Sequence, residues 1–185
     1  MTAGLNALSA ALASGEVSSA ELTEQALFRI AQTEKTLNAF ITVDADGARR
    51  AAEASDRRRK SGAALSPFDG IPYAAKDNFS TAGLRTTCAS EMLKNYLPPY
   101  DAAAVERLRA AGFVLIGKTN MDEFAMGSVT AASAFGASHN PTDPTRTCGG
   151  SSGWGRIPAG RCVSRRHSAA RSEPNRPTGG FPAGD

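Results

Sequence analysis

Residues 101–119, DAAAVERLRAAGFVLIGKT, pass directly from a helical pattern into a strand pattern. The apolar residues of the first part recur at three- and four-residue spacing: Ala104, Val105, Leu108 and Ala111. Gly112 follows where a helix would end, since glycine readily adopts the left-handed conformation found after helix C-termini. The next four residues, FVLI at 113–116, form a continuous apolar run that is typical of a buried strand. This stretch therefore predicts a helix over 101–111 and a strand over 113–117.

The same stretch also fits the nucleotide-binding pattern G-x-x-x-x-G-K-[ST], through Gly112, Gly117, Lys118 and Thr119. A phosphate-binding loop needs a strand before its first glycine and a helix beginning at the Lys-Thr pair. Here the helix comes first and the strand lies between the glycines, and a buried strand cannot wrap a phosphate. We therefore rank a P-loop NTPase last among the interpretations of this chain.

Other patterns place further elements around this unit. Helical spacing and capping residues predict helices at 5–15, from Ser18 onward, at 48–60 and at 121–126. Strands are expected at 39–43 and within GIPYAAKDN, residues 70–78. A strand followed by a helix and another strand indicates parallel pairing. The predicted fold class is α/β, with N-terminal helices preceding the sheet.

Composition divides the chain into three regions: a helical region with a short strand at 1–65, a core at 66–153, and a tail at 154–185. The tail is rich in arginine, proline and glycine and has no apolar periodicity, so we expect it to be disordered. The tail has six arginines and two acidic residues, so its net charge of +4 exceeds the +3 of the whole chain. The body therefore gives no reason to expect direct binding of nucleic acid.

Bulk features set the expected compartment. No apolar run approaches the roughly 20 residues that a membrane helix needs. The N-terminus lacks the basic segment of a signal peptide, and the three cysteines have no metal-binding spacing. We expect a cytoplasmic protein without a membrane anchor or a bound metal.

Two segments contain groups suited to catalysis. Lys76 follows the apolar run IPYAA, and burial of a lysine favours the neutral amine that acts as a general base. The alternative is an exposed lysine that opens a loop. Residues 149–153, GGSSG, fit G-x-S-x-G, the nucleophile turn of α/β-hydrolases. That interpretation lacks the required strand and helix, and its only downstream histidine, His167, lies in the tail; a flexible linker is the remaining alternative.

Together, the segments FDGIPYAAKDN, GLRTTCAS, AAGFVLIGKTNMDEFAMGS and CGGSSG resemble the amidase signature family over residues 4–153. LNAFITVD and NMDEFAMGS make the chain most similar to the A subunits of tRNA-dependent amidotransferases. The resemblance implies a mixed sheet flanked by helices and a Ser–cisSer–Lys mechanism. Lys76 would be the general base, Ser151 the cis-serine proton relay, and Gly127 and Ser128 substrate-binding residues.

The resemblance also implies a reaction and partners. Glutamine would be the amide donor, and the released ammonia would amidate Glu-tRNA(Gln) or Asp-tRNA(Asn) within an ATP-dependent ligase complex of protein biosynthesis. The B and C subunits would be the partners and would provide the contact with charged tRNA. The resemblance implies no cofactor.

After Gly153 the family pattern stops. Trp154 stands where a glycine is expected, and no segment like GGS-x-R-x-P, which carries the family's nucleophilic serine, follows. Near its expected place is Asn175, and Ser168 and Ser172 lack the glycine turn. We expect a truncated core without a nucleophile, inactive as written, and a shifted reading frame after Gly153 would explain the change. The alternatives are an amidase for another small amide and a non-catalytic remnant that binds the partner subunits.

Overall fold

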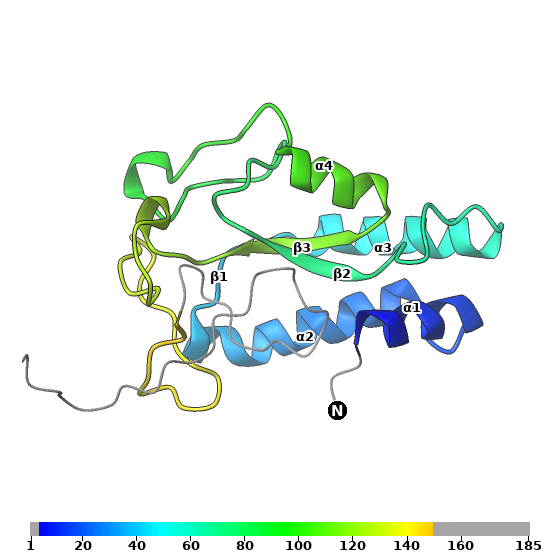
Figure 1. Cartoon of the computed structure of the whole chain (residues 1–185), viewed down its shortest axis with the longest axis horizontal. Coiled ribbons are helices and arrows are strands. Elements are labelled where there is room, and N and C mark those ends of the chain that lie inside the picture. Colours follow the sequence, from blue (N-terminus) through cyan, green and yellow to red (C-terminus); the bar gives the residue numbers. More distant parts are fainter. Residues whose placement is uncertain (1–3, 150–185) are drawn as a thin grey trace, which may run out of the picture.

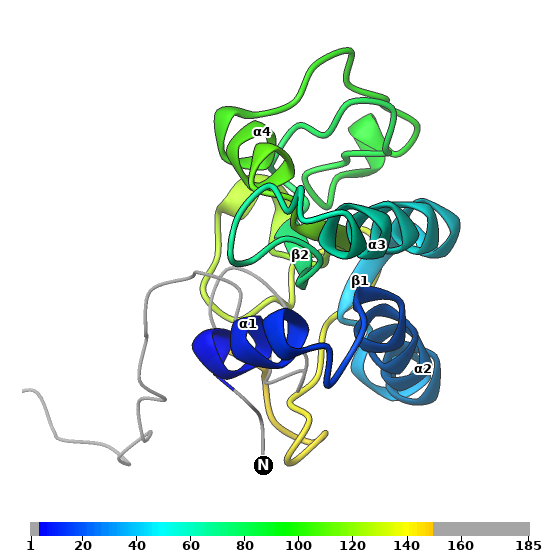
Figure 2. The same cartoon turned by 90° about the vertical axis from the view of Figure 1, so that its right-hand side faces the viewer.

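A computed structural model describes residues 4–149 as a mixed α/β fold (Figures 1 and 2). Its elements, in chain order, are α1 (Leu5–Ser14), α2 (Ser19–Leu37), β1 (Phe40–Val43), α3 (Ala45–Lys60), β2 (Pro72–Lys76), α4 (Ala103–Ala110) and β3 (Val114–Thr119). Short 3₁₀ turns occur at Glu91–Leu93 and Glu123–Ala125. The predicted α/β class is confirmed, and the tail expected to be disordered lies outside the described residues.

The three strands form one sheet in the order β1-β3-β2. β2 pairs with β3 in parallel, and β1 pairs with β3 antiparallel, so the sheet is mixed. At the end of the parallel pair, Lys76 lies opposite Thr119. Nearer the start of β2, the register shifts at a bulge between Tyr73 and Ala74. Because β1 comes from the first 65 residues and β2 and β3 from the second region, the two regions share one sheet.

The N-terminal helices begin at side-chain caps. In α2 the Ser18 hydroxyl accepts a hydrogen bond from the Glu21 N–H at 3.1 Å, and the Glu21 carboxylate accepts one from the Ser18 N–H at 2.8 Å. This reciprocal capping box confirms the predicted start. In α3, Asp44 accepts from the Gly47 N–H, so the helix begins at Ala45, ahead of the predicted residue 48.

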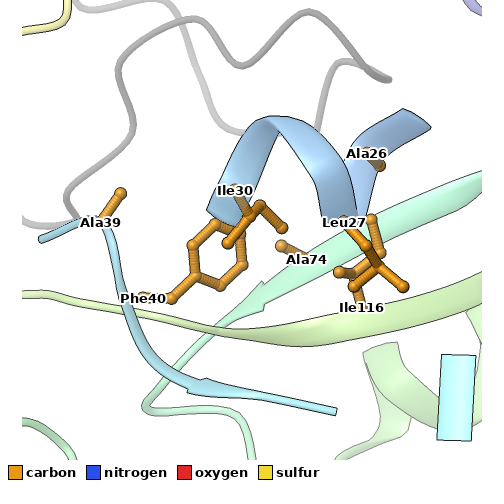
Figure 3. Close-up of a cluster of buried hydrophobic side chains, with 7 residues drawn as sticks. All are labelled: Ala26, Leu27, Ile30, Ala39, Phe40, Ala74 and Ile116. Carbon is orange, nitrogen blue, oxygen red and sulfur yellow. The ribbon is translucent and has the colours of Figure 1, made fainter. Parts of the chain in front are cut away.

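The main core lies between α2 and the sheet. It consists of Ala26, Leu27, Ile30, Ala39, Phe40, Ala74 and Ile116. Figure 3 shows Leu27 and Ile30 pointing from the helix toward the strands that carry Ala74 and Ile116. A second cluster joins Ala48 and Ala52 of α3 to Val114 of β3. β3 contributes a residue to each cluster, Ile116 to the first and Val114 to the second, so it packs against both α2 and α3.

α4 lies on the opposite side of the sheet from α1 and α2 (Figures 1 and 2). The predicted glycine stop is confirmed: Gly112 has a φ of 85°, and its N–H donates to the Arg109 carbonyl. The connection from α4 to β3 is therefore a single tight turn, which places β3 parallel to β2.

The turn before β2 is fastened to the end of α3. The Arg58 guanidinium donates to both carboxylate oxygens of Asp69 at 2.9 and 2.6 Å, and Asp69 is fully buried. Burial alone would raise the pKa of Asp69, but the guanidinium and the Leu65 N–H hold it below its ordinary value. Arg59 donates to the Asp69 carbonyl. These bonds fix the point at which β2 begins.

The helix predicted over 121–126 is wrong. Only a 3₁₀ turn forms, and Phe124 and Ala125 have left-handed φ values of 48° and 61°. Phe124 donates its N–H to Cys88, and Glu123 donates its N–H to Ala132, so these groups bond to distant loops rather than along a helix. Across residues 4–149, no helix combines the length and the apolar character that crossing a membrane requires.

Candidate active site

Lys76 is the last residue of β2, at the edge where the parallel strands β2 and β3 end together. It is half-buried. Burial lowers the pKa of its amine below the ordinary value, and the negative charge of nearby Asp122 opposes part of that decrease. The lowered pKa increases the fraction of neutral amine at neutral pH, which is the form that accepts a proton.

Next to Lys76, a fully buried ion pair joins the two strand ends. The ammonium of Lys118 lies 3.3 Å from one carboxylate oxygen of Asp77. It also donates to the Phe79 carbonyl at 2.8 Å and to the Thr86 hydroxyl at 2.7 Å. Lys118 is inaccessible to solvent, inside a strand, so it cannot contact a nucleotide phosphate. The P-loop interpretation is thereby excluded.

The second carboxylate oxygen of Asp77 accepts hydrogen bonds from the loop that follows β2. The Thr87 N–H donates to it at 2.7 Å and the Thr87 hydroxyl at 2.5 Å. The Cys88 N–H donates to the Asp77 carbonyl at 3.2 Å. Asp77, the residue after Lys76, is thus bonded both to Lys118 of β3 and to the loop at residues 87–88.

Asp122 organises the loop that follows β3. One of its carboxylate oxygens accepts from the N–H groups of Val129 and Thr130, at 3.2 and 2.9 Å. The other accepts from those of Ala131 and Ala132, at 2.9 and 3.1 Å. Burial would raise the pKa of Asp122, but these four N–H groups keep it below the ordinary value. The carboxylate is therefore ionised at neutral pH.

Gly127 and Ser128, the expected substrate-binding residues, lie in the loop enclosed by these bonds. Both are exposed. A Cβ on Gly127 would stand 2.4 Å from the carboxyl carbon of Asp122, so only glycine fits this close approach. The loop is thus packed directly on Asp122.

The segment that leads to the glycine-serine stretch reaches the same loop. The Cys148 sulfur lies 3.8 Å from the Val129 carbonyl oxygen. Burial raises the pKa of the Cys148 thiol, a hydrogen bond with Thr130 opposes this, and the charge of Asp122 adds to the increase. The structure therefore brings Lys76, the Asp122 loop and residue 148 together. Ser151, the expected relay, lies outside the described residues.

Sequence reasoning missed Asp77, Asp122 and Asn120. Asn120 is buried; its side chain donates to the carbonyls of Asn38 and Gly136, and accepts from the Met121 N–H and the Ser133 hydroxyl. The available signal was a run of polar residues directly after a buried strand, where side chains of neighbouring strand ends converge. Within residues 4–149, no group of three or more His, Cys, Asp or Glu side chains is arranged to hold a metal ion.

Comparison with known proteins shows the family to which this chain belongs. The family model described as Amidase matches residues 21–155. The chain belongs to the amidase family. The match ends close to Gly153, where the sequence resemblance also stops.

Relatives of this amidase-family chain include the A subunit of the glutamyl-tRNA(Gln) amidotransferase of Synechococcus sp. (strain CC9605). It is 52% identical over 155 residues, which are 83% of this chain and 32% of the relative. The peptide amidase structure from Stenotrophomonas maltophilia has a TM-score of 0.75 at 37% identity, covering 81% of this chain and 32% of that one.

The structure of the glutamyl-tRNA(Gln) amidotransferase A subunit from Thermotoga maritima has a TM-score of 0.59 at 39% identity, over 73% of this chain and 27% of that one. This chain therefore spans about a third of the length of the curated relatives that it matches. It resembles amidotransferase A subunits over that span.

Proposed function

We propose that this chain carries the basic end of an amidase proton relay, with Lys76 as the general base and Ser151 as the relay serine. The observation that supports this best is the half-buried Lys76, whose pKa is lowered by burial, at the strand end next to the loop that residue 148 contacts. A rigid, partly desolvated lysine is suited to take up a proton at neutral pH.

In a complete site the reaction proceeds by acyl transfer. Neutral Lys76 takes the proton of the Ser151 hydroxyl as Ser151 takes that of a nucleophilic serine. The nucleophilic oxygen attacks the amide carbon, and the C–N bond breaks as the nitrogen leaves as ammonia with the transferred proton. Water then releases the acid from the acyl-enzyme. Gly127 and Ser128 would contact the substrate from the Asp122 loop.

The proposed substrate is the side-chain amide of glutamine. Curated relatives with more than half of the aligned residues identical are named as the A subunit of glutamyl-tRNA(Gln) amidotransferase, which supports a donor of ammonia in a tRNA-dependent amidotransferase. The B and C subunits, as partners, would then receive the ammonia and bind the charged tRNA. A second candidate, hydrolysis of another small amide, is favoured by the higher TM-score of the peptide amidase.

We further propose that the 185-residue chain does not hydrolyse amides alone. Residues 154–185 contain no serine in the GGS-x-R-x-P setting of the family, and Asn175 has no hydroxyl to attack with. A relay without a nucleophile leaves the amide intact. A frame shift after Gly153 would account for this, and reading the other two frames of the gene for that segment tests it.

The deciding experiment is a chimera in which residues 4–149 replace the matching segment of the Synechococcus protein, assembled with its B and C subunits. We expect the chimera to release ammonia from glutamine, and Lys76→Ala to reduce that rate by about 100-fold or more. Lys94→Ala, at an exposed lysine, is the matched control and should keep the rate. The 185-residue chain should release none.

Two results would contradict the proposal: an active Lys76→Ala chimera, or ammonia released by the purified 185-residue chain. A chimera that cleaves a small amide but not glutamine would favour the second candidate. Failure of the chain to bind the B and C subunits in a pull-down would remove the partner proposal alone.

A further inference from the structure

Asp122 combines features that the proposed relay does not use. Its side chain is almost fully buried, yet its hydrogen bonds run to four successive backbone N–H groups of residues 129–132. A buried carboxylate held by backbone donors stays charged without a cation bonded to it. Such a group acts as a fixed negative charge.

The position of this charge follows from the sheet. Lys76 lies opposite Thr119 at the end of β3, and only Asn120 and Met121 separate Thr119 from Asp122. On its other side, Asp122 holds the loop on which residue 148 rests. Asp122 therefore follows the strand end that pairs with Lys76 and holds the loop that residue 148 contacts.

We propose that Asp122 is a positioning residue of the site, which folds the 127–132 loop around its carboxylate and sets a permanent negative charge beside Lys76. The role as part of a catalytic site rests on the proposed function; the loop and the charge do not. Asp122 itself contacts no reacting atom in this scheme.

Other charges near the site do not replace that of Asp122. Asp77 and Lys118 form a closed pair whose charges offset each other. Cys88 and Cys148 have thiol pKa values raised by burial, so both are neutral around pH 7. Among the residues that the structure describes, the carboxylate of Asp122 is a charge that opposes the loss of the Lys76 proton. Burial and the charge of Asp122 act on the pKa of Lys76 in opposite directions.

The test measures the amine rather than turnover. The 185-residue chain is treated with an amine-specific acylating reagent over a range of pH, and the rate at Lys76 is followed by peptide mass spectrometry. In Asp122→Asn the loss of the negative charge should raise the rate at neutral pH by about twofold or more, because more of the amine is neutral. Glu123→Gln removes an exposed charge from the adjacent position and should leave the rate unchanged.

A second measurement, hydrogen exchange of the backbone amides, covers the case in which Asp122→Asn does not fold. In the unmutated chain the amides of residues 129–132 should be protected, and in a folded Asp122→Asn variant these amides should exchange faster while β3 stays protected. The proposal is overturned if these amides exchange at the rate of an unstructured peptide in the unmutated chain. It is equally overturned if a folded Asp122→Asn shows an unchanged Lys76 rate. Neither readout needs turnover, so a silent glutaminase assay leaves this test intact.

Discussion

At the scale of single residues, the site region contains a pair of oppositely charged side chains that are inaccessible to solvent. Lys118 and Asp77 are both fully buried and pair with each other beneath the strand ends. Burial lowers the pKa of Lys118, and the Asp77 carboxylate opposes that decrease. Such a pair adds little net stability over an apolar pair, but removal of one partner leaves an uncompensated charge inside the protein.

Lys118→Met should therefore destabilise the fold strongly. Asp77 would be left buried without its cationic partner, which we expect to reduce the free energy of unfolding by about 3–5 kcal/mol. Urea denaturation measures the change, and the double variant Asp77→Asn/Lys118→Met should recover part of the loss. Lys94→Met, which removes an exposed pair with Glu91, should change stability by less than about 1 kcal/mol. Equal effects of the two lysine substitutions would contradict the role of the buried pair.

At the scale of elements, sequence spacing and capping residues predicted helices, whereas hydrogen bonds to residues farther along the chain determined the structure of the 121–126 segment. The spacing in 101–111 and Gly112 predicted α4 and its end, and Ser18 with Glu21 predicted the start of α2. The 121–126 segment has a helix-like sequence, but Asp122 takes its bonds from residues 129–132. No periodicity reveals that a carboxylate will satisfy backbone groups seven to ten residues away. Lys76 was predicted as a site residue from its apolar neighbours, and this role stays a prediction, whereas no sequence pattern pointed to Asp122.

A pair of glycines at helix ends gives a prediction at this scale. Gly112→Ala places a Cβ 2.3 Å from the Asp69 carboxylate and requires a φ of 85°. Gly62→Ala requires a φ of 73° in open space. We expect Gly62→Ala to lower the unfolding free energy by about 1 kcal/mol, from backbone strain alone, and Gly112→Ala to lower it by at least about 2 kcal/mol. Thermal or urea unfolding of both variants provides the comparison. A smaller loss of stability for Gly112→Ala than for Gly62→Ala would show that Asp69 moves away from the added Cβ at little cost.

At the scale of the whole molecule, two buried carboxylates connect distant parts of the chain. Asp69 joins α3 to the turn before β2, and Asp122 joins the end of β3 to its following loop. Both have pKa values below the ordinary 3.8 in the folded state. Folding therefore favours their ionised form, and this contribution to stability is complete above the pKa of the unfolded chain.

The expected consequence is a loss of stability in acid. As the pH falls below 3.8, the unfolded chain takes up protons that the folded Asp69 and Asp122 still exclude, so the free energy of unfolding decreases until their folded pKa values are passed. Urea midpoints at about pH 6 and about pH 3 measure the decrease. Asp69→Asn should make the two midpoints more similar than in the unmutated chain. An unchanged dependence on pH would mean that Asp69 is not coupled to folding.

The register of β2 against β3 carries a consequence of its own. Alternate residues of a strand face opposite sides of a sheet, so sliding β2 by a single position would exchange Asp77 for Lys76 opposite Thr119. The carboxylate of Asp77 would then take the place of the Lys76 amine at this strand end, while the strands kept the same path. The bulge after Tyr73 and the pairing of Asp77 with Lys118 each oppose that slide. The side chain that this strand end presents thus depends on the register of β2 against β3, to within one residue.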